Sequence, residues 1–494
     1  MSTGDRPYKI VIGLEVHVQL ATESKLFCGC STRFGAPPNT QTCPVCSGQP
    51  GALPVMNRRA IELSLLTAIA LNCDIPPMTK WDRKQYFYPD LPKDYQISQF
   101  DLPLSSEGWL DISDEKERFE PKRVGIIRAH LEEDAGKSMH DEAQGKGDTR
   151  IDLNRCGTPL LEIVSHPDMN SPEEAYAYLT QLKLLLTYLG VSDCNMQEGS
   201  LRADSNINLH IDTPDGVIAT PIVEVKNLNS FRAVERAMTY EADRQYDLWK
   251  ETGFVLGGPG GHKTTAGWDD SAQKTRPQRT KEESSDYRYF PDPDLVPLYV
   301  TQEEVAEIRE NLPELPVALH CRLQEEYNLS DYDAGVLVNQ GRPLVDYFIE
   351  TSKLCGDEKS ACNWITQDIL RELSEREIEI DAFTIRPQGL AELIGEIKSG
   401  TLTTSRAKDV LADMLKSGRS AADAMKELGI EAVDSSEIET LCRELLEANP
   451  KTVTDVKEGK LKAVGALIGQ AKKKNPNVKP NEIRDTCLRL IEDM

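Results

Sequence analysis

The first half of the chain combines two hydrophobic patterns. Between residues 8 and 20, branched apolar residues alternate with Glu15 and His17, a two-residue period that is typical of a half-buried strand. Similar strand-like stretches occur at 125–131, 207–211 and 222–225. Longer segments that are predicted as helices lie at 58–71, 172–189 and 231–249. Because strands and helices are mixed to about residue 240, the pattern predicts an α+β fold with a mixed α/β N-terminal region.

The pattern changes in the second half of the chain. A Gly/Pro-rich run at 254–267 is typical of a loop, and after residue 297 helical periodicity dominates to the end. Residues 403–405 resemble a helix N-cap and mark the start of a second helical part. The predicted domains are a mixed α/β domain over 1–297, an all-α domain over 298–402 and a small α-helical tail domain over 403–494.

The composition is that of a soluble globular protein with several domains. A chain of 494 residues exceeds one ordinary core, and 39% hydrophobic with 28% charged residues disfavours disorder. The formal net charge of −24 argues against a protein that coats nucleic acid, because phosphate repels it. Residues 441–494 differ, with 11 Lys/Arg against 8 Asp/Glu, a balance of +3. Such a tail fits contact with phosphate, and equally an ordinary solvated helical face.

Neither a targeting segment nor a membrane span is predicted. The N-terminal residues lack a cationic start followed by an apolar core, so we expect no signal peptide. No run approaches the roughly 18 apolar residues that a spanning helix needs. Eight of the twelve cysteines are scattered singly, as expected of reduced thiols. These features predict a cytoplasmic protein without a membrane partner.

The other four cysteines form two close pairs. Cys28 and Cys30 make a CxC pair, and Cys43 and Cys46 make a CxxC pair, with 12 residues between the pairs. Two tight turns that present four thiolates favour tetrahedral coordination of a structural Zn²⁺. Such a closed site has no open position for a substrate, so its expected role is to brace a Gly/Pro-rich loop. The alternatives are four unliganded thiols or a redox pair at the CxxC.

Acidic residues and histidines recur on several strand-like segments. Because side chains alternate between faces, three pairs are each expected on one strand face: Glu15 with His17, His130 with Glu132, and Glu224 with Lys226. Glu133 would take the opposite face of its strand. Residues 196–206 add Glu198, Arg202 and Asp204. Any one of these pairs is also typical of a solvent-exposed strand face, but all of them together predict one shared site.

The chemistry of such a site is indicated only in outline by the residues. Carboxylates, with imidazole as an addition, are suitable ligands for Mg²⁺, and Mg²⁺ with Lys and Arg holds nucleotide phosphates in many enzymes. The chain has no Walker A motif and no protein-kinase signature set. It also has no GxSxG or Ser-rich amidase signature. The residues therefore predict metal-dependent phosphate or carboxylate chemistry of unspecified type.

A series of long motifs makes the prediction more specific. In order along the chain they are IGLEVHVQL, the two cysteine pairs, KQYFYPDLPKDYQISQFD, HLEEDAGK, RCGTPLLEIVSHPD, NMQEGSLRADSNI, VEVKNLNSFRAVERA and SSDYRYFPDPDL. Together they resemble the GatB family, the B subunits of the aspartyl/glutamyl-tRNA amidotransferases, densely over residues 8–300. The remainder resembles the helical domain and the YqeY-like tail of that family. The chain has no room for the inserted domain of a related archaeal protein, which favours the bacterial type.

The resemblance implies an ATP-dependent ligase that acts in translation. Members of this family use ATP to phosphorylate the side-chain carboxylate of Glu-tRNA(Gln) or Asp-tRNA(Asn). Ammonia from glutamine, hydrolysed in a separate amidase subunit, then displaces the phosphate, and a small third subunit holds the two larger ones together in a heterotrimer. The implied cofactors are ATP, Mg²⁺ and structural Zn²⁺. The alternative is a non-catalytic, zinc-braced tRNA-binding scaffold that supports the amidase. The clustered acids argue against it, because carboxylates repel the phosphates of RNA unless a cation lies between them.

The resemblance also implies roles for particular residues. The implied Mg²⁺ ligands are His17, Glu132 or Glu133, and Glu224, with Glu15 beside them. The implied contacts to phosphate or to the aminoacyl end are Lys84, Arg202, Lys226 and Arg288. Glu198 and Asp204 are implied to position Mg²⁺ or to line a channel. The tail is expected to contact the tRNA through lysines: Lys457, Lys460, Lys462, Lys472, Lys473 and Lys474.

Overall fold

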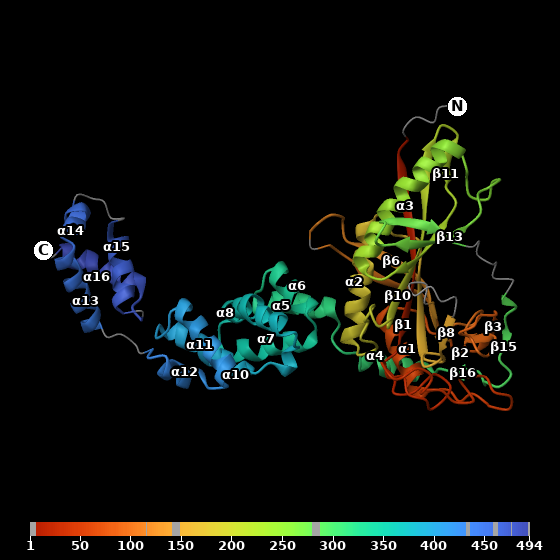
Figure 1. Cartoon of the computed structure of the whole chain (residues 1–494), viewed down its shortest axis with the longest axis horizontal. Coiled ribbons are helices and arrows are strands. Elements are labelled where there is room, and N and C mark those ends of the chain that lie inside the picture. Colours follow the sequence, from red (N-terminus) through yellow and green to blue (C-terminus); the bar gives the residue numbers. More distant parts are fainter. Residues whose placement is uncertain are drawn as a thin grey trace. The chain divides into compact units, whose positions relative to one another are not determined.

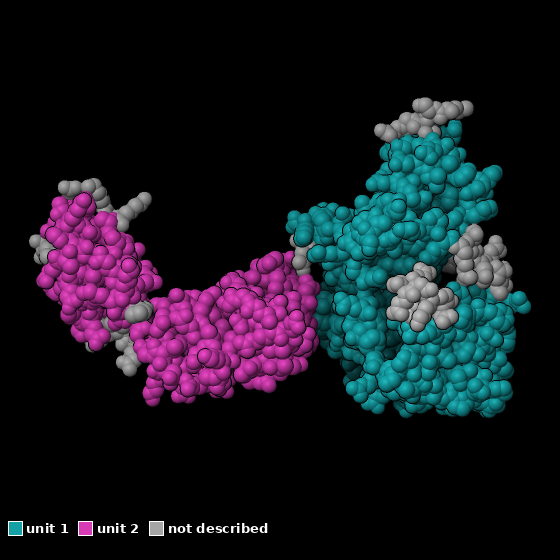
Figure 2. Space-filling model, in the orientation of Figure 1, with its two compact units in different colours: residues 1–319 teal, residues 320–494 magenta. Residues whose placement is uncertain are grey.

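The computed structural model describes residues 6–114, 116–140, 149–278, 287–430, 435–457, 463–475 and 477–492. Two compact units divide the chain, Met1–Leu319 and His320–Met494 (Figure 2). The division lies inside helix α5 (Pro316–Tyr327). The first unit holds all the strands of the described residues, and the second is helical. The predicted α+β fold, with a mixed N-terminal region followed by helices, is confirmed.

A nine-stranded sheet forms the framework of the first unit. Its strand order is β14-β13-β12-β10-β1-β9-β6-β5, with β11 paired to β10, and all neighbours are antiparallel except β12 and β13. The strands are β1 (Tyr8–Gln19), β5 (Ser105–Ile112), β6 (Lys122–Glu133), β9 (Pro159–Ser165), β10 (Leu201–Thr213), β11 (Gly216–Ala219), β12 (Val223–Leu228), β13 (Thr264–Asp269) and β14 (Lys274–Pro277). Segments far apart in sequence are therefore neighbours in the sheet.

One face of this sheet is apolar and carries helices. In β1, Leu14, Val16 and Val18 are buried, and they share one hydrophobic core with residues of helices α1, α2 and α3. The helices are α1 (Arg58–Ala70), α2 (Pro172–Tyr188) and α3 (Phe231–Thr252), and α3 runs alongside the sheet in Figure 1. Because alternate side chains of a strand point to opposite faces, covering the apolar face leaves the polar positions on the other face.

Local sequence signals fix the ends of the two long helices. The Ser171 hydroxyl accepts a hydrogen bond from the Glu174 N–H, and the Ser230 hydroxyl accepts one from the Ala233 N–H. Both are N-caps that satisfy an otherwise unpaired backbone donor. At its other end α3 stops at Gly253, whose φ of 66° is left-handed and suits glycine. The predicted helices at 172–189 and 231–249 are thus confirmed with nearly the expected bounds.

Three smaller sheets complete the first unit. They pair β15 (Phe290–Pro291), β3 (Asp82–Gln85) and β4 (Tyr95–Ser98); β16 (Leu298–Tyr299) and β2 (Met78–Thr79); and β7 (Lys137–His140) and β8 (Thr149–Asp152). Strand β4 contacts β6 of the large sheet. The three-stranded sheet thereby brings residues near 84 and near 289 beside the large sheet. Helix α4 (Gln302–Glu310) packs on α1.

The second unit contains helices and no strand in its described part. After α5 come α6 (Asp331–Asn339), α7 (Arg342–Cys355), α8 (Glu358–Trp364), a π-helical turn (Ile365–Ile369), α9 (Leu370–Arg376), a 3₁₀ turn (Ile380–Ala382), α10 (Pro387–Ser399), α11 (Thr404–Ser417) and α12 (Ala421–Glu427). The Thr403 hydroxyl caps α11 by accepting from the Arg406 N–H, so the predicted cap is confirmed.

The last four helices have a hydrophobic core of their own. They are α13 (Ser435–Ala448), α14 (Pro450–Lys457), α15 (Val464–Lys474) and α16 (Pro480–Glu492), and buried Cys442, Leu467 and Ile483 belong to their core. Of the tail lysines, Lys460 and Lys462 lie outside the described residues. No helix in the described ranges is both long and apolar enough to cross a membrane.

Candidate active site and cysteine cluster

The polar face of the large sheet carries a row of charged side chains across four strands. His17 on β1 is paired in register with Arg202 on β10 and with Glu162 on β9, and Glu162 is paired with His130 on β6. Leu14 and Val16 point to the helices, so Glu15 and His17 share the opposite face, as predicted. The two-residue alternation of each strand, combined with this register, brings residues from four distant segments together.

Two of these side chains, His17 and Glu162, converge with Glu132 of β6. His17 Nδ1 lies 3.6 Å from Glu132 Oε1 and 3.9 Å from Glu162 Oε2, and the three ligand atoms lie within 4.8 Å of one another. His17 Nδ1 is buried and has no hydrogen-bond partner among the described residues. Two carboxylates and one imidazole nitrogen form a donor set that fits a divalent cation. The orphaned nitrogen beside two acids is the observation that supports such a fit.

The electrostatics of the two histidines differ. Burial by itself would lower the pKa of His17, but the adjacent carboxylates of Glu132 and Glu162 outweigh burial and raise the pKa to about 9. The pKa of His130 is instead lowered, chiefly by burial. The acids nearest His17 thus concentrate negative charge at its Nδ1, where a proton or a metal cation is stabilised.

The two adjacent acids at 132 and 133 have different surroundings. Glu132 faces His17, whereas Glu133 lies on the opposite face, where it accepts a hydrogen bond from the Ile97 N–H at 3.1 Å and pairs with Lys93. The structure therefore brings Glu132, and not Glu133, into the convergent set. Glu162 belongs to this set and was missed by the sequence analysis. Its signal was a single acid within the apolar strand LLEIV.

A second polar cluster lies on β1, β10 and β12. Lys226 Nζ lies 2.6 Å from Asp204 Oδ2 and 3.7 Å from Glu224 Oε1, and the Thr265 hydroxyl donates to Glu224 Oε2 at 3.1 Å. Glu15 Oε1 accepts a hydrogen bond from Asn206 Nδ2 at 2.9 Å. Within the described residues, Glu224 and Glu15 are outside the convergent His17 set. Predicted site residues thus form two clusters on one face.

Arg202 lies at the edge of the convergent set. Its Nη2 donates to Asp134 Oδ2 at 2.7 Å, while its buried Nε has no hydrogen-bond partner in the described part of the chain. Burial raises the pKa of Asp134, but the charges of Arg202 and Arg155 more than compensate and hold it below its usual range. Arg202 and the exposed Glu198 also line a cavity of about 570 Å³. An orphaned guanidinium nitrogen at a cavity wall is suited to an anion.

Lys84 on β3 lies in an aromatic setting. Its Nζ is 5.9 Å from the ring centre of Tyr86 and 5.2 Å from that of Tyr287, and within the described residues it makes no ion pair. Burial lowers the pKa of Lys84, but the negative charges around it, with that of Glu132 the largest and that of Glu162 among them, together outweigh burial and raise it. The side chain of Arg288 is exposed, and its residue has a left-handed φ of 44°. The structure thus brings Lys84 near the convergent acids.

The four clustered cysteines meet as predicted. Their sulfur atoms lie within 4.8 Å of one another, which fits the closed donor set of a zinc ion. A hydrogen bond from Cys28 is the main cause that lowers the pKa of Cys46 to about 4, and the charge of Lys25 adds to it. Lys25 is fully buried, with its Nζ 2.7 Å from the Gln41 carbonyl and 3.6 Å from Cys46 Sγ.

The cysteine loop is bonded to the segment that holds Asp134. The Leu26 N–H donates to the Gly157 carbonyl at 2.9 Å, and the Gly157 N–H donates to the Asp134 carbonyl at 2.8 Å. The Cys156 thiol donates to the Cys46 carbonyl at 3.4 Å. The loop is therefore connected, through residues 156–158, to the strand end beside Arg202.

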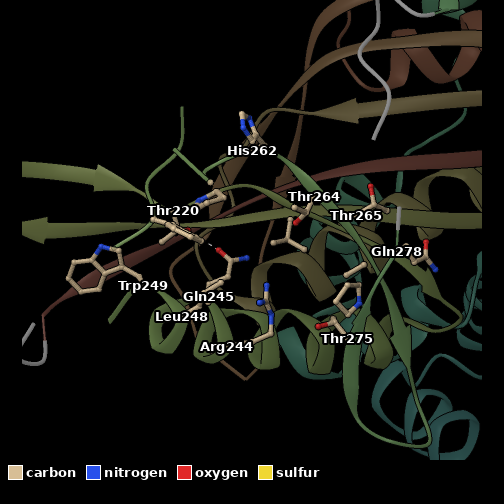
Figure 3. Close-up of a pocket in the computed structure, with 16 residues that line it drawn as sticks. Thr220, Arg244, Gln245, Leu248, Trp249, His262, Thr264, Thr265, Thr275 and Gln278 are labelled. Carbon is tan, nitrogen blue, oxygen red and sulfur yellow. Dashed lines mark hydrogen bonds between the residues drawn. The ribbon is translucent and has the colours of Figure 1, made fainter. Parts of the chain in front are cut away.

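A separate cavity lies between α3 and the strands at one edge of the sheet. It has a volume of about 320 Å³, with Gln245 and Trp249 of α3 on one side and Thr264 and Thr265 of β13 on the other (Figure 3). Thr220 donates to Gln245 within it at 2.8 Å. None of the predicted site residues lines it, although Thr265 also contacts Glu224.

Comparison with known families covers most of the chain. The model of the GatB/GatE catalytic domain matches residues 10–306, and the model described as the GatB domain matches residues 346–487. The first match contains both polar clusters, the cysteine cluster and Lys84. The second contains most of the helical unit.

Curated relatives match along nearly their entire length. A protein of Rhodopirellula baltica is 60% identical over 488 residues, covering 99% of this chain and 98% of its own. A protein of Caldanaerobacter subterraneus is 45% identical over 485 residues, covering 98% of each chain, and one of Moorella thermoacetica is 47% identical over 470 residues, covering 94% and 96%. Each is named as the B subunit of an aspartyl/glutamyl-tRNA(Asn/Gln) amidotransferase.

Proposed function

This chain belongs to the GatB family, the B subunits of the aspartyl/glutamyl-tRNA(Asn/Gln) amidotransferases, and on that premise we propose how it performs its part of the reaction. ATP transfers its γ-phosphoryl group to the side-chain carboxylate of Glu-tRNA(Gln) or Asp-tRNA(Asn), which releases ADP. The C–O bond to that phosphate then breaks as ammonia attacks the acyl carbon, a proton is lost, and the amide and inorganic phosphate are released. This makes the chain the kinase part of a glutamine-dependent carbon–nitrogen ligase.

The observation that carries the proposal is that the carboxylates of Glu132 and Glu162 converge on His17 Nδ1, which has no hydrogen-bond partner in the described structure. These residues would hold Mg²⁺, which when bound neutralises charge on the phosphates of ATP. The second cluster, Glu15, Asp204, Glu224 and Lys226, is proposed to orient the aminoacyl end beside it. A rigid sheet suits this task, because phosphoryl transfer depends on positioning more than on covalent chemistry.

Two cations are proposed to contact phosphate. Lys84 is half-buried and makes no direct ion pair among the described residues, so its ammonium is available to a bound phosphate. Arg202 lines the adjoining cavity, its Nε has no hydrogen-bond partner among the described residues, and Asp134 fixes its Nη2. The exposed Arg288 remains a proposed contact of phosphate or of the aminoacyl end, and Glu198, on the wall of that cavity, remains proposed to position Mg²⁺ or to line a channel.

Zinc is proposed to have a structural role only. Cys28, Cys30, Cys43 and Cys46 would take all four positions of a tetrahedral ion and leave none for substrate. The bonds from this loop to residues 156–158 support a bracing function at the edge of the site. Zinc would thus hold the wall of the cavity that Arg202 and Glu198 line.

Partners are proposed from the same premise. A separate amidase would supply ammonia from glutamine, and a small third protein would complete a cytoplasmic heterotrimer. The domains are proposed as 1–297 for catalysis, 298–402 as a helical connection and 403–494 for tRNA. Lys472 and Lys473 at the end of α15, with Lys457, would contact tRNA phosphates.

The test is amidation by the reconstituted heterotrimer. Misacylated tRNA, ATP, Mg²⁺ and glutamine should yield amidated tRNA and one ADP for each amide formed. The Glu162→Gln variant should form neither product while the glutaminase reaction of the amidase persists. Wild-type yields of ADP and amide from this variant would contradict the site. A complex that binds misacylated tRNA and hydrolyses glutamine but forms neither ADP nor amide would favour the scaffold alternative.

A further inference from the structure

An aromatic ladder flanks the convergent acids, and the proposed chemistry does not use it. Phe100 and Tyr289 stack with ring centres 4.1 Å apart and planes inclined by 9°. Tyr289 meets Tyr287 edge-on at 6.1 Å, and Tyr287 meets Tyr86 at 6.0 Å. Because β3 and β15 pair, segments that are far apart in the chain form this ladder. The rings therefore gather through tertiary structure at one edge of the site.

The outer end of the ladder is open to solvent. The side chain of Phe100 is 42% exposed. Its backbone is held firmly: the Phe100 N–H donates to Asp82 Oδ2 at 3.0 Å, and its carbonyl accepts from Arg128 Nη1 at 3.1 Å. A fixed and exposed ring that is already stacked on one side presents a flat surface for another ring on its other side.

The inner end of the ladder reaches the charged site. Burial is the main cause that raises the pKa of Tyr289, and the charges of Glu132 and Glu162 act on the same hydroxyl. The same acids act on Lys84, whose ammonium lies against Tyr86 and Tyr287. Through Tyr287, Tyr289 thus connects the exposed stack to the ammonium of Lys84.

A flat apolar surface beside a cation and convergent acids matches the parts of a nucleotide. A purine base stacks on aromatic rings, while its phosphate takes the cation and the metal. A docking protein would need a larger apolar patch than one ring pair. We propose that the Phe100–Tyr289 pair is the stacking surface for an adenine base whose phosphate contacts Lys84. This inference rests on the proposed function, because it assigns a subsite within the same reaction.

Adenine reaches this enzyme from two sources, ATP and the terminal adenosine of tRNA. Two fluorescent probes separate them: 1,N6-ethenoadenosine triphosphate, and an RNA hairpin whose single-stranded CCA end carries 2-aminopurine as its last base. Both fluorophores are quenched when they stack on an aromatic ring. Quenching should occur with one of the probes on the wild-type complex. That probe identifies the source.

The variants test the aromatic face of Phe100 rather than the size of its side chain. Phe100→Leu keeps an apolar side chain and removes the aromatic face, whereas Phe100→Tyr keeps the face. Phe100→Leu should weaken binding of the quenched probe roughly 5- to 100-fold, the worth of one base stack, and Phe100→Tyr should restore binding. Tyr332→Ala, which removes a ring that is 72% exposed on α6, is the matched control and should bind both probes as wild type does.

Steady-state kinetics separate this inference from the proposed function. If ATP is the source, Phe100→Leu raises KM for ATP and leaves KM for misacylated tRNA unchanged, and the reverse holds for tRNA. Quenching of neither probe, or equal affinities for wild type and Phe100→Leu in an active complex, would overturn the stacking site while the amidotransferase function stands. A wild-type complex that forms no ADP would instead contradict the proposed function.

Discussion

Two clusters of metal-type ligands lie in the same compact unit and are built in opposite ways. The cysteine cluster comes from 19 consecutive positions, Cys28 to Cys46, on one loop. The convergent acids and His17 come from three strands, and His17 is more than 100 positions from either acid. Four thiolates enclose an ion completely, whereas two carboxylates and an imidazole leave positions open. The first arrangement suits bracing, and the second suits chemistry on a bound phosphate.

The difference is also visible in how charge is compensated. The cysteine sulfurs have the buried ammonium of Lys25 beside them, bonded to the Gln41 carbonyl. The convergent acids have Lys84 nearby, which is packed among rings and makes no ion pair within the described ranges. Lys25 therefore already has its partners within the protein, whereas Lys84 is available to a bound anion.

The largest expected effect separates Glu132 from its neighbour Glu133. Glu132→Gln should reduce ATP-dependent amidation about 100- to 1000-fold, because it removes one oxygen ligand at the phosphate site. Glu133→Gln should instead lower the free energy of unfolding by roughly 3 kcal/mol, since it leaves buried Lys93 without its partner. Amidation rates and thermal melts of the two variants check this. Equal rates in both would remove the distinction between the two acids.

The next effect concerns the closed cluster. Cys43→Ser should reduce bound zinc from one ion per chain to none and lower the Tm by roughly 5–10 °C, since each kcal/mol is worth about 2–4 °C in a domain of this size. Glutaminase activity of the heterotrimer should persist. Metal analysis and melting curves of reduced protein are the measurements. Wild-type protein without zinc would show that the four thiols are unliganded.

A smaller effect is expected at the buried ammonium beside the thiolates. Lys25→Met keeps most of the side-chain volume but removes the charge and the bond to the Gln41 carbonyl. Zinc affinity should fall roughly 10- to 100-fold, as for other residues that support metal ligands. Competition with a zinc-binding dye measures the affinity. Arg58→Met, at an exposed residue of α1, is the control and should retain wild-type affinity.

The smallest effect is expected outside both clusters. Lys472→Gln and Lys473→Gln together should weaken tRNA binding and flatten its dependence on salt by about 0.7–0.9 log units per log unit of salt for each phosphate that is no longer neutralised. Lys474, which pairs with Glu444 at 2.9 Å, is left in place. Filter binding of misacylated tRNA across a salt series measures the slope. An unchanged slope would identify these lysines as ordinary solvated surface.

Much of the fold could be predicted because its signals are local. The alternation around Glu15 and His17 predicted a strand with these two residues on one face, and β1 confirms it. Helix α11 begins where Thr403 was expected to cap it. The cysteine spacing predicted a four-sulfur cluster because one short loop brings its ligands together. The order of the nine strands was not predicted, because strand pairing depends on contacts between distant segments.

The candidate site likewise combines residues that the sequence predicted with residues that only the structure identified. From sequence, Glu132 and Glu133 were expected on opposite strand faces and both remained candidate ligands, and only the structure shows that Glu132 is the one that faces His17. Glu162 gave one weak signal, a single acid in an apolar strand, and it became a candidate ligand when register placed it between His17 and His130. Glu224 carried the sequence signal of a ligand, yet it lies with Lys226 in the neighbouring cluster.

The sequence by itself determined the family, the change from a mixed first region to a helical second one, and the cysteine cluster, because each depends on residues that are close along the chain. The tertiary structure alone decided which acids meet His17, that Lys84 lies among the rings of Tyr86 and Tyr287, and that Phe100 stacks on Tyr289. Most of these contacts join residues that are distant in sequence. Their geometry follows from strand register, which no local pattern encodes.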